Sequence, residues 1–90
     1  MDRKMSNHRC PVCGYPGLME EPRSPSGGPS YEICPSCGFE FGVTDDDLGL
    51  TYEEWRRRWI ASGMRWDSGD IEPPPEGWDP RQQLRDAGLA

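Results

Sequence analysis

The chain has 90 residues, of which 33% are hydrophobic, and it contains 11 Gly and 10 Pro. A chain this short and polar buries little apolar surface against its conformational entropy, so it forms one domain at most and needs a further cross-link to stay folded. Its formal net charge of −6 disfavours binding to nucleic-acid phosphates, which requires clustered Lys and Arg, and favours a basic partner or no charged partner.

The N-terminal residues 1–7 are polar and predict a disordered tail, followed by a single domain over residues 8–90. We divide this domain into a metal-binding ribbon at 8–44, a helix at 51–63, and a Pro- and Trp-rich segment with a short helix at 64–90. The N-terminus has no apolar leader, and no stretch approaches the length of a membrane span. We therefore expect a reducing, cytoplasmic environment.

One short motif occurs twice, as CPVCGY at residues 10–15 and as CPSCGF at residues 34–39. Two C-x-x-C pairs at this separation predict a four-thiolate metal site, most often for zinc, with iron as the alternative. The predicted ligands are Cys10, Cys13, Cys34 and Cys37. Two disulfides in a secreted domain would be the other use of four cysteines, and a reducing compartment argues against them. His8 precedes the first motif, but four cysteines already complete a tetrahedral shell.

The glycine that follows each pair accepts a positive φ, so that the chain turns back over the metal. Short strands are predicted at 17–21 and 30–33, joined by the Pro-, Ser- and Gly-rich loop 22–29. Alternating apolar residues predict a third strand at 39–43. Asp45, Asp46 and Asp47 follow it. They predict either a contact for a basic partner or a solvated turn, because the offsets of a calcium-binding loop are missing.

Thr51 and Glu54 form a capping box, which predicts a helix that begins at Tyr52 and stops at Gly63. The apolar residues on its expected buried side are Tyr52, Trp55, Trp59 and Ile60. This stripe favours packing onto the ribbon over an exposed partner site. Of the three consecutive arginines at 56–58, at least two should be exposed.

Three consecutive prolines at 73–75 predict a stiff polyproline segment between Trp66 and Trp78. The prolines can stack on these indoles, and the rival interpretation is a ligand for a proline-binding domain. Asp79 and Pro80 mark the start of a second, short helix that should extend to Ala87.

The stretches CPVCGYPGL at 10–18 and YEICPSCGFEFGV at 31–43, with the acidic run after them, resemble the small bacterial cysteine-rich CPCC family. The resemblance covers about half of the chain, and Val12 stands where many members carry another cysteine. It implies a zinc-ribbon-like fold and a bacterial source, but no reaction. Rubredoxins, which hold iron and carry electrons, share the paired C-x-x-C-G motifs, although their spacer is usually longer.

These features predict a small α+β fold, in which a zinc-ribbon or rubredoxin-like knuckle hairpin carries one amphipathic helix and a short C-terminal helix. Four cysteines leave no open metal position, so we expect a structural metal and no catalysis. The first functional hypothesis is a protein-binding module, in a specific form an acidic immunity protein that inhibits a basic toxin. The alternatives are a rubredoxin-like electron carrier and a nucleic-acid-binding zinc ribbon.

Overall fold

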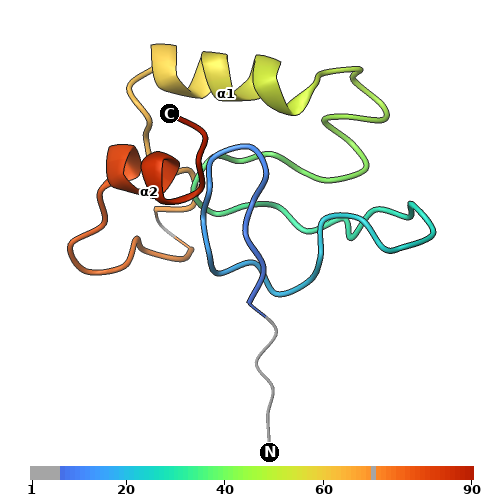
Figure 1. The fold of residues 1–90 in the computed structure, drawn as a ribbon, viewed down its shortest axis with the longest axis horizontal. Coiled ribbons are helices and arrows are strands. Elements are labelled where there is room, and N and C mark those ends of the chain that lie inside the picture. The colour runs from blue at the N-terminus through green and yellow to red at the C-terminus, as the bar shows by residue number, and fades with distance from the viewer. Residues whose placement is uncertain (1–6, 70) are drawn as a thin grey trace, which may run out of the picture.

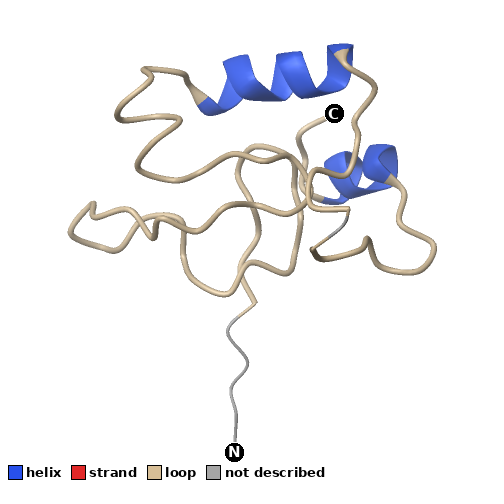
Figure 2. Ribbon diagram, turned by 180° about the vertical axis from the view of Figure 1, so that it is seen from behind, coloured by secondary structure: helices blue, strands red, loops and turns tan. Residues whose placement is uncertain are grey.

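The computed structural model describes residues 7–69 and 71–90, so most of the predicted tail lies outside the described residues. The N-terminal half consists of loops at the centre of the molecule, and both helices come from the C-terminal half (Figure 1). Helix α1, Tyr52–Ala61, runs across these loops, and helix α2, Pro80–Asp86, lies beside them (Figure 2). Within the described residues, no helix has the length and apolar character needed to cross a membrane.

The first knuckle, residues 10–15, and the second knuckle, residues 34–39, each close with the same two hydrogen bonds. The N–H of Cys10 donates to the carbonyl of Tyr15 over 2.8 Å, and the N–H of Gly14 donates to the carbonyl of Cys10 over 2.8 Å. The corresponding bonds from Cys34 to Phe39 and from Gly38 to Cys34 measure 3.0 and 2.8 Å. The repeated motif therefore folds twice into the same turn.

The predicted strands do not form over the described residues, where pairing is limited to three isolated antiparallel bridges. Two of the bridges flank the knuckles and the third lies at the tip of the loop between them: His8 with Leu18, Ile33 with Glu40, and Arg23 with Pro29. Prolines at positions 16, 22 and 29 lie directly beside the two predicted strands and limit the ladder at their ends, because proline lacks an N–H donor. The predicted third strand is also wrong, since the chain turns from Phe41 onward and Gly42 has a φ of +100°. The fold stays compatible with a small α+β class with little strand.

Helix α1 begins and ends where its capping residues predict. Thr51 and Glu54 form the reciprocal capping box, and Gly63 follows the helix with a φ of +104°. Trp59 is buried, whereas Ile60 is 38% exposed and does not belong to the packed face. Arg56 is half-buried in its place, and the other two arginines of the run are exposed, as expected.

The core joins the two knuckles to both helices. Its buried side chains include Leu18, Phe39, Phe41, Trp59 and Leu84 together with the four cysteines. The Phe39 ring lies 5.3 Å from that of Tyr52 and 6.0 Å from that of Trp55, both edge-to-face. The aromatic face of α1 thus packs onto the second knuckle and forms part of the core. Of the two alternatives, this is the one that the sequence favoured.

Candidate metal centre

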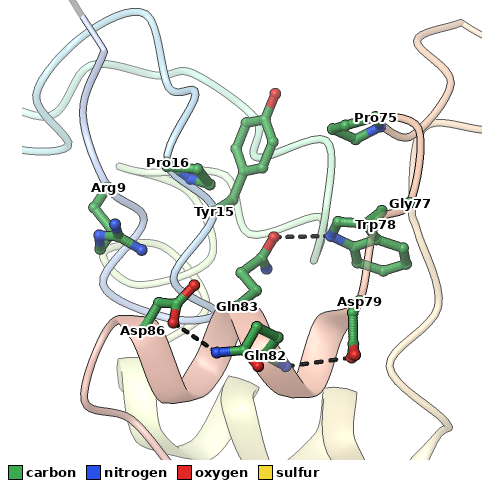
Figure 3. A pocket seen from close by; sticks show the side chains of 10 residues that line it. All are labelled: Arg9, Tyr15, Pro16, Pro75, Gly77, Trp78, Asp79, Gln82, Gln83 and Asp86. Carbon is green, nitrogen blue, oxygen red and sulfur yellow. Dashed lines mark hydrogen bonds between the residues drawn. The ribbon is translucent and has the colours of Figure 1, made fainter.

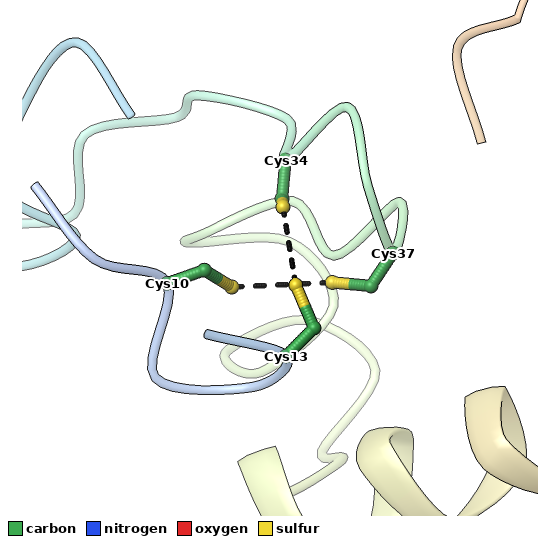
Figure 4. Close-up of side chains that lie close together, drawn as sticks. All are labelled: Cys10, Cys13, Cys34 and Cys37. Atoms are coloured by element: carbon green, nitrogen blue, oxygen red, sulfur yellow. Dashed lines mark hydrogen bonds between the residues drawn. The ribbon is translucent and has the colours of Figure 1, made fainter. Parts of the chain in front are cut away.

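The four cysteine sulfurs converge on one point between the two knuckles (Figure 4). All four Sγ atoms lie within 4.8 Å of one another, with 3.9 Å between Cys10 and Cys37 and 3.6 Å between Cys13 and Cys34. A tetrahedral ion with bonds of about 2.3 Å to sulfur would separate the sulfurs by about 3.8 Å. The cysteines are therefore positioned to hold one metal ion.

Disulfide pairing does not describe this arrangement. All four cysteines are free thiols, and their separations far exceed the roughly 2.0 Å of a sulfur–sulfur bond. Both of these contacts, of 3.9 and 3.6 Å, join a cysteine of the first knuckle to a cysteine of the second. His8 pairs through its backbone with Leu18 and does not belong to the cluster.

The electrostatics of the cluster favour a cation. Hydrogen bonds from Cys10, and then from Cys34 and Cys37, lower the pKa of the Cys13 thiol. Hydrogen bonds with Cys10 and Cys13, together with burial, raise the pKa of Cys34 and of Cys37. Ionisation of Cys13 is thus favoured and ionisation of Cys34 and Cys37 is opposed, because like charges at this distance repel. A divalent cation bound by all four thiolates would remove that opposition.

The C-terminal half supplies donors to the carbonyls of the first knuckle. Arg56 of α1 donates from Nε to the carbonyl of Val12 over 2.7 Å and from Nη2 to that of Pro11 over 2.9 Å. Gln83 of α2 is 7% exposed and donates from Nε2 to the carbonyl of Cys13 over 3.1 Å. Buried carbonyls need such partners, so both helices are fixed to the turn that carries two of the four cysteines.

The second knuckle receives equivalent donors from α1, from α2 and from the segment between them. The indole Nε1 of Trp55 donates to the carbonyl of Cys37 over 2.9 Å. The backbone N–H of Asp67 donates to the carbonyls of Pro35 and Ser36 over 3.0 and 3.2 Å. The same Gln83 Nε2 also donates to the buried Ser36 hydroxyl over 3.1 Å and so bridges the two knuckles.

Sequence reasoning did not identify Arg56, Asp67 or Gln83 as parts of this centre. Each lies far along the chain from the knuckle that it contacts, and none belongs to a motif with a fixed offset. The sequence did offer one indication for Arg56. It lies one helical turn from Tyr52 and from Trp59, and therefore on the side of the helix that was expected to be buried.

The predicted acidic contact Asp45–Asp47 is partly engaged within the chain. Arg23 donates to Asp45 over 2.8 Å and to Asp46 over 2.7 Å. Asp45 also accepts from the N–H of Gly42 over 2.7 Å. Burial opposes ionisation of Asp45, but these hydrogen bonds outweigh it and lower the pKa of its carboxyl group. The acidic run therefore fastens the loop tip to the turn after the second knuckle, and it leaves Asp47 exposed.

The chain is similar in sequence to two bacterial proteins. It is 34% identical over 71 residues to "Uncharacterized protein YoaQ" of Bacillus subtilis strain 168, a match that covers 63% of this chain and 60% of that protein. It is 32% identical over 73 residues to "Uncharacterized protein YozI" of the same organism, with 64% and 60% covered. The chain thus spans less than two thirds of these relatives. No family model and no solved structure matches it.

Proposed function

We propose that the chain is a non-catalytic protein-binding module stapled by one structural zinc ion. The observation that carries this proposal is the burial of the ligand set, since Cys10, Cys13 and Cys34 are fully buried and Cys37 is 4% exposed. A catalytic zinc keeps a position open for water or substrate, whereas a structural zinc is closed by four protein ligands. The zinc-ribbon class belongs to this proposal and rests on the two equivalent knuckle turns.

Metal analysis of the purified chain tests the zinc assignment. We expect about one zinc per chain, and a colourless protein, from the ligand count. A red protein with one iron per chain would instead support the electron-carrier alternative. That alternative is favoured by Cys37, which borders a surface cavity of about 440 Å³ and would bring the metal close to an electron donor.

The partner in this proposal is a basic protein, in the specific form of a toxin that the chain neutralises. The net charge of −6 supports it, because opposite charge steers association and makes its rate depend on salt. Since Asp45 and Asp46 already bind Arg23, the exposed Asp47 is the better residue to test.

A protein encoded beside the chain's own gene supplies the direct test of the inhibitor function. We expect its expression alone to arrest growth and co-expression of the chain to relieve the arrest. Asp47→Lys should slow association at low salt, and Glu53→Lys, at an exposed position of α1, is the control with an equal change of charge. An association rate that changes neither with salt concentration nor with Asp47→Lys contradicts the electrostatic part of the proposal.

We further infer that the chain belongs to the CPCC type of cysteine-rich bacterial proteins and works in the cytoplasm. The two uncharacterised Bacillus relatives and the four-cysteine cluster support the first inference. The second is supported by four free thiols, which persist in a reducing compartment.

A further inference from the structure

A surface cavity of about 290 Å³ lies between the first knuckle and α2 (Figure 3). Two aromatic residues and two prolines provide its apolar lining: Tyr15, Trp78, Pro16 and Pro75. Because the cavity does not reach any cysteine, it is separate from the metal centre.

The two knuckles differ at the position of the aromatic residue that lines this cavity. The aromatic residue that ends the second knuckle, Phe39, is fully buried in the core. Its counterpart in the first knuckle, Tyr15, is only half-buried and begins a row of aromatic rings. Tyr15 and Trp66 have ring centroids 5.5 Å apart, and Trp66 and Trp78 have centroids 5.0 Å apart, both edge-to-face. Since all three rings stay partly exposed, the row presents ring surface to solvent.

Internal hydrogen bonds hold this aromatic row in place. Trp78 Nε1 donates to Gln83 Oε1 over 2.8 Å, and Trp66 Nε1 donates to the carbonyl of Glu72 over 2.6 Å. Both indole N–H groups are therefore satisfied, and the rings offer apolar faces. Burial, and then the charge of Glu72, raise the pKa of Tyr15, and a hydrogen bond to the Glu72 carboxylate adds to this effect, so the Tyr15 hydroxyl group keeps its proton and is held by Glu72.

The polar part of the cavity is acidic on balance. The lining contains two carboxylates, Asp79 and Asp86 at the two ends of α2, and one cation, Arg9. Asp79 caps the helix by accepting from the N–H groups of Arg81 and Gln82, and Asp86 accepts from the side chain of Gln82. Both carboxylates are exposed, and the chain as a whole has a net charge of −6, so the site complements a cation.

We propose that this cavity binds an extended, basic, proline-containing segment of a partner protein. Grooves lined by aromatic rings bind polyproline segments, because a proline ring fits flat against an aromatic face and the segment is already extended. The exposed faces of Tyr15 and Trp78 fit the proline rings of such a segment, and the two aspartates fit an adjacent Arg or Lys. The proposal rests on the proposed protein-binding function and names the surface and the chemistry of the partner.

Three capped synthetic peptides test the specificity, with tryptophan fluorescence of the zinc-loaded chain and the amide resonances of Tyr15, Gly77 and Trp78 as readouts. The first peptide carries two prolines beside two arginines, the second replaces the prolines with alanine, and the third replaces the arginines with glutamate. We expect the first to bind and each of the others to bind about tenfold more weakly. Equal binding of the proline and alanine peptides overturns the proposal, as does binding of none.

Two variants locate the site, each with a matched control. Tyr15→Leu should abolish binding of the first peptide, whereas Tyr31→Leu, at a tyrosine that is 62% exposed elsewhere, should not. Asp86→Asn should weaken binding about twofold to fivefold, as expected for an exposed charge pair, and Glu53→Gln should leave it unchanged. Asp86 is exposed on α2, so this variant keeps the test valid even if Tyr15→Leu perturbs folding. Binding that neither variant alters overturns the assignment.

The outcomes separate this inference from the proposed function. If the toxin encoded by the neighbouring gene binds the chain while the peptides do not, the cavity inference fails alone. If the first peptide binds through Tyr15 and Asp86 while no toxin is neutralised, the cavity inference stands and the inhibitor function fails.

Discussion

Gln83 offers the sharpest test of how α2 is held on the metal centre. Its side-chain amide donates to the carbonyl of Cys13 and to the hydroxyl of Ser36, each over 3.1 Å. Its Oε1 accepts from Trp78 Nε1 over 2.8 Å. We predict that Gln83→Leu destabilises the zinc-loaded chain strongly, although leucine fills nearly the same volume and leaves little cavity.

The magnitude follows from the groups that lose their partner. The Ser36 hydroxyl can reorient, but the carbonyl of Cys13 and the indole N–H of Trp78 have fixed directions. A buried polar group without a partner costs about 1–3 kcal/mol, so the substitution should cost about 2–4 kcal/mol. For a domain of this size, each kcal/mol corresponds to about 4–8 °C in the melting temperature. We therefore expect a decrease of about 10 °C or more.

The neighbouring residue provides the control. Gln82 is exposed, and its side chain bonds only Asp86 and Arg85 on the surface. Gln82→Leu should therefore change the stability by no more than about 0.5 kcal/mol. Thermal unfolding of the zinc-loaded variants, with metal content checked before each scan, measures the difference. Equal melting temperatures for the two variants would show that the three hydrogen bonds do not hold α2 in place.

Three further predictions concern the metal, the core and one glycine. Cys37→Ser should release the metal and unfold the chain, because metal binding supplies folding energy; retained metal by elemental analysis contradicts this. Trp59→Ala should cost about 3–5 kcal/mol, since Trp59 is 6% exposed, and denaturant unfolding measures it. Gly14→Ala should cost more than Gly49→Ala in the same assay. Both glycines have positive φ, but a Cβ at Gly14 would lie 2.7 Å from the backbone of α2, whereas nothing lies within 4 Å at Gly49. If both substitutions lowered the free energy of unfolding equally, the strain of a positive φ would explain both losses, and the contact with α2 would not contribute.

The sequence predicts well those features that depend on local chemistry. Both helices begin at their predicted capping residues, Thr51 and Asp79, because a cap is decided by a side chain and the N–H groups next to it. The convergence of the cysteines was also predictable, since each C-x-x-C-G motif fixes its own turn.

The sequence failed where pairing depends on distant partners. Alternation of Phe39, Phe41 and Val43 indicated a strand, but its pairing is limited to the bridge between Ile33 and Glu40, because the chain turns at Phe41. Over the described residues, the predicted strands 17–21 and 30–33 form no bridge with each other. The carboxylate of Glu32 instead accepts from the N–H groups of Met19 and Glu20, over 2.9 and 3.1 Å. The Glu32 side chain thus accepts hydrogen bonds that a paired strand would accept through its backbone. The alternation of apolar and polar residues in a sequence does not predict such a contact.

The contacts of the knuckle carbonyls change how the chain should be divided. The ribbon at 8–44 was expected to be the metal-binding unit, with the helices packed onto it. However, Arg56, Trp55 and Gln83 satisfy carbonyls inside the two turns that carry the ligands. If the ribbon were separated from these residues, its turns would expose those carbonyls and lose most of their apolar cover. The helices therefore complete the metal centre as well as cover it, and metal affinity should depend on residues more than forty positions away from the cysteines they support.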